Sequence, residues 1–365
     1  MASINKYAAP EMLVDSIEVL PNEILALIFN MLSLKERLKI ELVSPRWHQL
    51  SLGLWKTTKE FGFGCCLASG STRYKLGKFN RFAVKVFIRR CSLEKIIWTA
   101  GGTLDGACMP FIAKHCPNLV TLLIDSEPNR IESFDDVMLS LIVQNCRSLR
   151  HLIVRNCDHV STGFIRDANC SLFTLSLPNE TKRAKFWFPG IGYKDNLRTK
   201  IDLIAEKFTN LIELDISFVE CRKLKQIGNL KFLEKLKLHS LCRCFDTHWP
   251  CLLPGGRRCE RQKRISKIFA NKIYLKELDI SRCLHNNYLR LDDSKFIKML
   301  SFLPALESLN ITNHSSISNK SLDRWFGGGE MIGLRRRDAP LTLFCAGTGI
   351  IVHEGFLPHW KFDKN

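Results

Sequence analysis

Residues 149–154 read Leu149-Arg150-His151-Leu152-Ile153-Val154, with apolar side chains at the first, fourth and sixth positions. Further instances of this spacing start at Leu93, Leu119, Leu172, Leu211, Leu233, Leu275 and Leu306. Each instance predicts a short strand with one apolar face, because side chains alternate between the two faces of a strand. No such strand can bury that face alone, so the instances must stack on one another around a shared core.

This pattern resembles the leucine-rich repeat and extends over residues 93–365. Consecutive starts are as close as 233 − 211 = 22 residues and as distant as 275 − 233 = 42 residues. Because leucine-rich repeats take about 20–29 residues, the long intervals imply insertions near residues 179–199 and 242–266. A ninth instance is placed at Leu341, Phe344 and Ala346. The resemblance implies an α/β repeat solenoid, with a curved parallel sheet inside and helices outside.

Cysteines recur at fixed places in this repeat. Cys116 and Cys146 each lie three residues before a repeat leucine, whereas Cys157 and Cys283 lie eight residues after one. This arrangement resembles the cysteine-containing class of leucine-rich repeats. A buried cysteine behaves as a small apolar residue, so we expect these thiols to pack in the core. The 15 cysteines are odd in number and scattered, which argues against a disulfide framework.

A helical unit precedes the repeats. Pro21 and Glu23 are typical of a helix start, and the helix that they open is apolar almost all round, so it needs burial on more than one side. Ser33 to Glu36 form a capping box for a second helix. Ser44 and Pro45 begin a third helix.

The chain therefore divides into four predicted parts. Residues 1–15 are a flexible N-terminal arm, residues 16–59 the helical unit, residues 60–92 a connection, and residues 93–365 the repeats. Three short helices cannot bury so much apolar surface among themselves. Their remaining surface must be covered by the rest of this chain or by another protein.

The helical unit resembles an F-box. The matching string is Leu20-Pro21-x-Glu23-Ile24-Leu25-x-x-Ile28-Phe29-x-x-Leu32, then Arg37-Leu38, Val43-Ser44-x-x-Trp47-x-x-Leu50 and Leu54-Trp55. Pro45 departs from the pattern, which usually has a basic residue there. F-boxes dock on the Skp adaptor of ubiquitin ligases. The resemblance implies that the following residues make or support that contact: Leu20, Pro21, Ile24, Leu25, Ile28, Leu32, Leu38, Val43, Trp47, Leu54 and Trp55.

Together, the two resemblances imply a substrate-recognition adaptor of a Skp–cullin–F-box E3 ubiquitin ligase. The expected partners are the Skp adaptor, through it a cullin–RING ligase, and a protein substrate that is marked for ubiquitin-dependent degradation. We expect no catalytic residue, metal or cofactor. The start of the chain lacks a signal-peptide pattern, and no apolar run approaches the ~18 residues of a membrane span. We therefore expect a cytoplasmic or nuclear location.

The substrate is expected on the concave face of the sheet, on side chains that flank the inward leucines. These candidates are Asp125, His151, Arg155, Glu213, Asp215, Lys235, Lys237, His239, Glu277, Asp279 and Asn310. With Lys95 added, the charges on this face sum to 4 − 5 = −1, although the chain carries +18. A nucleic-acid groove would concentrate lysine and arginine, so we do not expect nucleic acid there. Whether these charges recognise a partner or pair across neighbouring strands is left open.

Three alternatives accompany this interpretation. The chain could be a leucine-rich-repeat scaffold, or a basic RNA-binding protein, without a ligase role. It could also serve an elongin-linked cullin ligase, because Thr103-Leu104-x-x-x-Cys108-x-x-x-Ile112 is similar to an elongin-binding box. A Cys- and Arg-rich segment also invites a metal or nuclear-import interpretation, and it contains Cys242, Cys244, His248, Cys251, Arg257, Arg258, Cys259 and Arg261.

Overall fold

The structure is a computed structural model. It describes residues 17–32, 34–63, 92–98, 109–125, 135–155, 157, 160–178, 201–217, 221–239, 268–270, 272–281, 291–321, 341–348, 350 and 360–363. The predicted N-terminal arm and both predicted insertions lie outside these residues, as does the Cys- and Arg-rich segment.

The N-terminal unit consists of helices. They are the 3₁₀ helix η1 (Ile17–Val19), α1 (Asn22–Met31), α2 (Leu34–Ile40) and α3 (Pro45–Thr57). Helix α1 begins directly after Pro21, with Glu23 in its first turn. At α3 the Ser44 hydroxyl accepts a hydrogen bond from the backbone N–H of Trp47 at 3.2 Å, as expected of an N-cap. The three predicted helices are confirmed.

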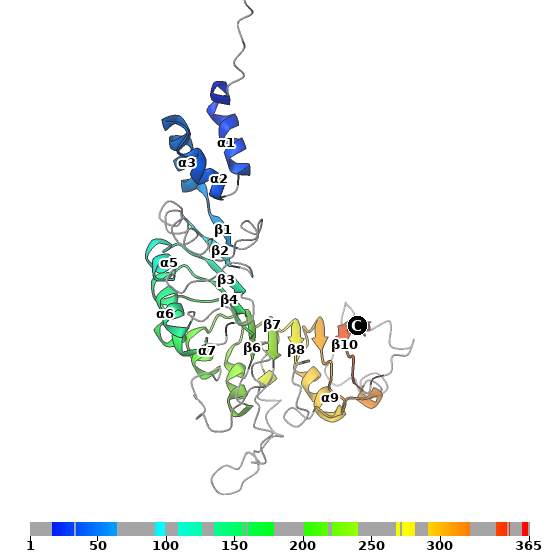
Figure 1. The fold of residues 1–365 in the computed structure, drawn as a ribbon. Coiled ribbons are helices and arrows are strands. Elements are labelled where there is room, and N and C mark those ends of the chain that lie inside the picture. Colours follow the sequence, from blue (N-terminus) through cyan, green and yellow to red (C-terminus); the bar gives the residue numbers. More distant parts are fainter. Residues whose placement is uncertain are drawn as a thin grey trace, which may run out of the picture.

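The rest of the described chain is built on one sheet of eleven parallel strands, which follow one another in chain order. Figure 1 shows the strands stacked side by side along the solenoid. They are β1 (Glu60–Phe63), β2 (Lys95–Trp98), β3 (Thr121–Asp125), β4 (His151–Arg155), β5 (Thr174–Leu177), β6 (Glu213–Ser217), β7 (Lys235–His239), β8 (Glu277–Asp279), β9 (Ser308–Asn310), β10 (Leu341–Phe344) and β11 (Trp360–Asp363).

Helices return the chain between strands and cover one side of the sheet (Figure 1). They are α5 (Met109–His115), α6 (Asp136–Asn145), η3 (Gly163–Asp167), α7 (Ile201–Lys207), η6 (Cys221–Asn229) and α9 (Asp293–Ser301). The two 3₁₀ helices, η3 and η6, belong to the two shortest repeats, which start at Leu149 and Leu211. A 3₁₀ helix rises more per residue than an α-helix, so it spans the return with fewer residues.

The core lies between the sheet and these helices, and the repeat residues fill it. In the first eight repeats the apolar side chains at the first, fourth and sixth positions are buried, except that Leu177 is half-buried. Cys116, Cys146 and Cys157 are also buried, which confirms their packing role. Burial raises the pKa of the Cys146 thiol to about 12, so this thiol stays protonated and unreactive at neutral pH.

The sheet departs from the predicted pattern at both ends. Strand β1 lies inside the predicted connection of residues 60–92, where its sequence lacks the repeat spacing, and it pairs in parallel with β2. In the ninth repeat the predicted frame is wrong by one residue, because Leu343, not Phe344, pairs with Leu309. Leu343 and Cys345 are the buried residues there. Strand β11 continues the sheet beyond β10 and carries no repeat signal.

A recurring hydrogen-bonded clip links successive repeats. Asp136, the first residue of α6, accepts a hydrogen bond from the backbone N–H of Ser161 at 2.8 Å and another from the Ser161 hydroxyl. Twenty-five residues also separate Asp293, the first residue of α9, from Ser318, which donates both bonds at 2.7 Å. Gly163 makes room for the first clip, because a Cβ there would lie 2.8 Å from the Asp136 carboxylate.

We expect Asp136→Ala to destabilise the repeats around η3 by about 2–4 kcal/mol. The change leaves two donors of Ser161, a buried residue, without their charged acceptor, and such a loss costs more than the bond contributes. Solenoid repeats can open locally, so hydrogen exchange at the Ser161 amide measures the local effect. Chemical denaturation measures the change in the free energy of unfolding. The exposed neighbour-repeat change Glu206→Ala is the control. Equal protection of Ser161 in both variants would contradict the prediction.

Candidate functional site

Exposed large apolar side chains concentrate on the N-terminal helices. Of the eleven such residues in the described part of the chain, seven lie between residues 17 and 43. These seven are Ile17, Val19, Ile24, Leu27, Met31, Leu42 and Val43. Apolar side chains that gather on an exposed surface are typical of protein-interaction sites. The solenoid does not cover it.

Helix α1 carries the centre of this surface, because two of its sides are apolar. One side places Leu25 and Phe29 in the core of the unit, where the Phe29 ring packs against Trp47 with centroids 5.0 Å apart. The other side presents Ile24, Leu27 and Met31, which are 43%, 62% and 88% exposed. Their spacing of three and four residues places them on one helical stripe, which we call the α1 stripe.

Two arginines fix α1 in place. The Arg46 guanidinium on α3 donates hydrogen bonds to the start of α1, reaching the Asn22 side-chain oxygen at 2.9 Å and the Leu20 carbonyl at 2.6 Å. The Arg37 guanidinium on α2 donates to the end of α1, at the Asn30 and Leu32 carbonyls. The α1 stripe is therefore held at both ends and is pre-organised for binding, which lowers the entropic cost of association.

Trp55 joins the helical unit to the solenoid. Its side chain is 1% exposed and belongs to the same core cluster as the repeat leucines, with Leu38 and Leu52 packed against that cluster. The Trp55 indole N–H donates to the Glu41 carboxylate, which also accepts a hydrogen bond from the Ser51 hydroxyl at 3.1 Å. The Arg37 guanidinium lies 5.5 Å from the centre of the Trp55 ring. The N-terminal helices are thus packed onto the first repeats of the solenoid.

The structure sorts the predicted adaptor residues into three groups. Pro21, Ile24 and Val43 are exposed. Five are half-buried: Leu20, Ile28, Leu32 and Leu54 pack against the core of the helical unit, and Leu38 packs against the solenoid core. Leu25, Trp47 and Trp55 are buried, so they support the surface from below.

Sequence reasoning overlooked part of the exposed surface. Leu27, Met31 and Leu42 are more exposed than Ile24 but were not among the predicted contact residues. The signal for Leu27 was present, because an apolar residue on the side of α1 away from Leu25 and Phe29 has no place in the core of so small a unit.

Comparison with known proteins bears on these helices directly. Residues 17–58 match the F-box-like family. This chain has an N-terminal F-box-like domain. A leucine-rich-repeat solenoid follows it, as the parallel strand register and the buried repeat leucines establish.

Solved structures with a similar course of the chain were also found. The yeast Rad7–Elc1 complex shares 13% identity over 94% of this chain and 93% of that chain, with a TM-score of 0.45. A TLR13–ssRNA13 complex shares 15% identity over 76% of this chain and 36% of that chain, at 0.42. The leucine-rich-repeat-containing protein LegL7 from Legionella pneumophila shares 11% identity over 81% of this chain and 83% of that chain, with a TM-score of 0.36. No curated protein matches the chain.

Beyond the F-box-like domain, the concave face of the sheet is the second candidate surface. Its charged residues pair across neighbouring strands. The Lys235 ammonium on β7 lies 2.9 Å from the Glu277 carboxylate on β8 and 3.6 Å from the Glu213 carboxylate on β6. The Arg155 guanidinium lies 3.8 Å from the Asp125 carboxylate. Of the two interpretations left open by the sequence, pairing across strands is therefore observed.

Hydrogen bonds between polar side chains also join neighbouring strands on this face. The His151 ring contacts the Thr174 hydroxyl at 3.0 Å, and that hydroxyl donates to Glu213 at 3.3 Å. Two further bonds join Ser176 to Asp215 and Asn310 to Asp279, at 3.1 and 3.2 Å. The register places Lys237 between Asp215 and Asp279, and His239 opposite Ser217. The predicted concave residues therefore lie on one continuous surface, and its charges are largely compensated.

The alternative motifs are placed only in part. Of the elongin-like box, residues 103–108 lie outside the described residues, whereas Ile112 is fully buried in α5. Within the described ranges, no cluster of three or more potential metal ligands occurs. No helix in that part of the chain combines the length and apolar character needed to cross a membrane.

Proposed function

We propose that this chain is the substrate-recognition adaptor of a Skp–cullin–F-box ubiquitin ligase. The observation that carries the proposal is the exposed α1 stripe on a domain that matches the F-box-like family. Burying an apolar side chain such as Ile24, Leu27 or Met31 contributes about 1.5–3 kcal/mol before the cost of association. The exposed apolar residues of the α1 stripe therefore support docking of the Skp adaptor on α1.

The solenoid holds the substrate in this proposal. Its concave face is a rigid platform on which a protein segment can lie next to the ligase-bound ubiquitin-transfer enzyme. Proximity and orientation accelerate the transfer, and the chain itself contributes no reacting group. Because the concave charges compensate one another, a substrate is selected by shape and hydrogen bonding more than by long-range attraction.

Capture of purified adaptors tests the proposal. The wild-type chain is expected to bind the Skp adaptor and to leave the elongin B–C pair unbound. Leu20→Ala with Pro21→Ala is expected to abolish capture of the Skp adaptor, because it removes apolar surface at the entry to α1. A folded double variant that captures the Skp adaptor as well as the wild type does would contradict the contact assignment, and wild-type capture of elongin alone would replace the proposed partner.

A further inference from the structure

A second group of exposed apolar side chains lies on the solenoid. Outside the F-box-like domain, four large apolar side chains are exposed in the described part of the chain, and three of them lie in two neighbouring turns. These three are Phe232, Ile273 and Tyr274, which are 51%, 54% and 50% exposed. The Phe232 and Tyr274 rings are nearly parallel, at 22°, and their centroids are 6.5 Å apart. We call these three residues the turn patch.

The packing of the repeat does not require aromatic residues at these positions. Phe232 and Tyr274 each directly precede a repeat leucine. In the other six of the first eight repeats, a small or polar residue holds this position: Ser92, Asn118, Ser148, Ser171, Asn210 and Ala305. Single exposed apolar residues are ordinary, but three that gather on neighbouring turns indicate a contact surface.

Backbone hydrogen bonds place successive turns side by side along one edge of the sheet. The Lys276 N–H donates to the Glu234 carbonyl at 2.8 Å, and the Glu307 N–H donates to the Lys276 carbonyl at 2.7 Å. Leu275 is fully buried, so Tyr274 and Lys276 on either side of it face outwards. The turn patch therefore lies beside a row of charged side chains, one from each of three successive repeats.

Two opposite charges near the turn patch have no ion-pair partner among the described residues. In the charged row, the Lys276 ammonium pairs with the Glu234 carboxylate at 2.9 Å. Glu307 is exposed and attracts Lys276 from a longer distance, but no ion pair to it occurs within the described ranges. Lys231 is also exposed, directly before Phe232, and the same part of the chain holds no ion-pair partner for it.

The spacing of these two charges suits a short extended segment. Lys231 precedes β7 and Glu307 precedes β9, so they lie two strands apart, or about 10 Å at the usual distance between paired strands. An extended chain covers that distance in about three residues. Two residues of such a segment then lie between the charged ends, over the turn patch.

We propose that the turn patch receives an extended segment of a partner protein in which an acidic and a basic residue flank two apolar residues. The acidic residue pairs with Lys231, the basic residue pairs with Glu307, and the apolar residues pack on Phe232 and Tyr274. The inference rests on the proposed function only where it names this partner as the ligase substrate. In that role, the turn patch adds a second contact at the edge of the concave face.

A displayed library of random short peptides, selected on the whole wild-type chain, tests this proposal. We expect the selected peptides to carry an acidic and a basic residue around apolar ones. The best of them, made as a synthetic peptide, is expected to bind Phe232→Ser with Tyr274→Ser more weakly by at least about tenfold, because the apolar contact is lost. Serine holds the same position in three other repeats, so the solenoid tolerates this change.

Charge reversal makes the test specific. Selection on Lys231→Glu is expected to give peptides with two basic residues, and selection on Glu307→Lys peptides with two acidic residues, because each change inverts the charge preferred at one end. Arg166→Glu and Asp167→Lys are matched controls, since both residues are exposed on η3 and the changes in net charge are the same. Both controls are expected to select the wild-type pattern.

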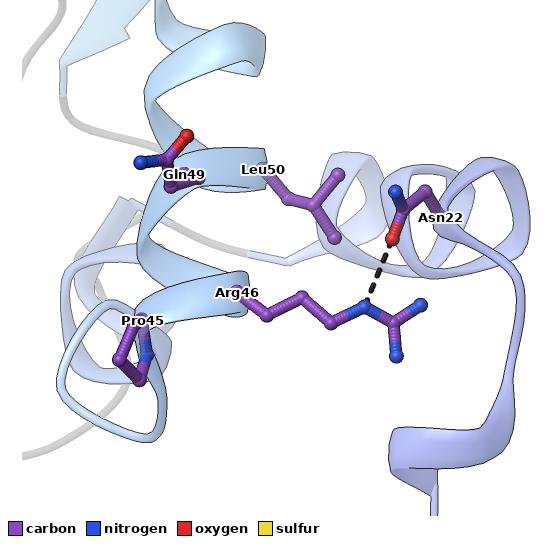
Figure 2. A pocket seen from close by; sticks show the side chains of 5 residues that line it. All are labelled: Asn22, Pro45, Arg46, Gln49 and Leu50. Atoms are coloured by element: carbon purple, nitrogen blue, oxygen red, sulfur yellow. Dashed lines mark hydrogen bonds between the residues drawn. The ribbon is translucent and has the colours of Figure 1, made fainter.

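This inference and the proposed function fail in different ways. If no peptide binds the wild type more tightly than the serine variant, or if the charge reversals leave the selected pattern unchanged, the inference is overturned. All of these variants leave the F-box-like domain intact, in which Arg46 joins α3 to Asn22 at the start of α1 (Figure 2), so their capture of the Skp adaptor is expected to match the wild type. A wild-type chain that selects the expected peptides but captures no adaptor supports the turn patch and overturns the proposed function.

Discussion

Replacing Ile24 and Leu27 together by Asp is expected to reduce affinity for the Skp adaptor by more than a hundredfold. Both side chains lie on the exposed α1 stripe, where the adaptor would bury them. An aspartate forced into an apolar contact must lose its hydration without a partner, at a cost of about 3 kcal/mol or more. That cost corresponds to a factor of more than a hundred in the dissociation constant, which calorimetry or surface-based binding measures directly.

The same double variant is expected to fold normally, because neither side chain contributes to the core cluster of Leu25, Phe29 and Trp47. Val137→Asp is a matched control, since Val137 is 62% exposed on the solenoid helix α6. We expect this control to bind like the wild type. Unchanged affinity in the Ile24 and Leu27 variant, with a wild-type unfolding curve, would mean that the adaptor docks elsewhere or not at all.

The largest effect on stability is expected for Trp55→Ala. The change removes a fully buried indole from the core that the helical unit shares with the solenoid. It also removes the N–H donor to the Glu41 carboxylate, whose side chain is only 7% exposed. Truncating a buried tryptophan costs about 3–5 kcal/mol. We expect the variant to unfold at a lower denaturant concentration, which circular dichroism measures. We also expect faster hydrogen exchange in α2 and α3.

Trp55→Phe separates the two contributions. Phenylalanine retains most of the buried ring but cannot donate to Glu41, so the loss is expected to fall to about 1–3 kcal/mol. The exposed change Lys56→Ala, one residue further on, is the control and is expected to alter stability little. If Trp55→Ala unfolds at the same denaturant concentration as the control, the indole does not join the helical unit to the solenoid.

The repeat was predictable because its periodicity follows directly from strand geometry. Leu149, Leu152 and Val154 are buried as that geometry requires. The start of α1 follows from Pro21, and the capped start of α3 follows from Ser44. The ends of the sheet were less accessible to this reasoning. Strand β1 is recruited by pairing with β2, and its own sequence carries no such periodicity. At β10 the sequence offers two leucines, Leu341 and Leu343, as starting points for the repeat frame, and both are buried. Only the register with β9, in which Leu343 pairs with Leu309, selects the frame.

The candidate site was predictable as a segment but not as a surface. The spacing of Leu20 to Trp55 indicates three helices with excess apolar area, yet it does not tell Leu25, which is buried, from Ile24, which is exposed. That distinction depends on how α1 is rotated against α3, and the Arg46 and Arg37 hydrogen bonds fix this rotation. The Arg46 contacts are distant in sequence, since Arg46 lies 24 to 28 residues from its acceptors, whereas Arg37 lies five and seven residues from the acceptors at the end of α1.

The shared tryptophan core also limits how this protein can be taken apart. Residues 17–58 share a core with the first repeats, because Trp55 belongs to the cluster of repeat leucines and Leu38 and Leu52 pack against it. We therefore expect this unit to lose stability when it is separated from the repeats. A chimaera that carries the opening helices of another protein would need an equivalent indole and carboxylate to seal that junction. Under the proposed function, this packed junction would hold the bound substrate at a fixed angle to the ligase, and that angle would determine which substrate lysines lie within reach of ubiquitin.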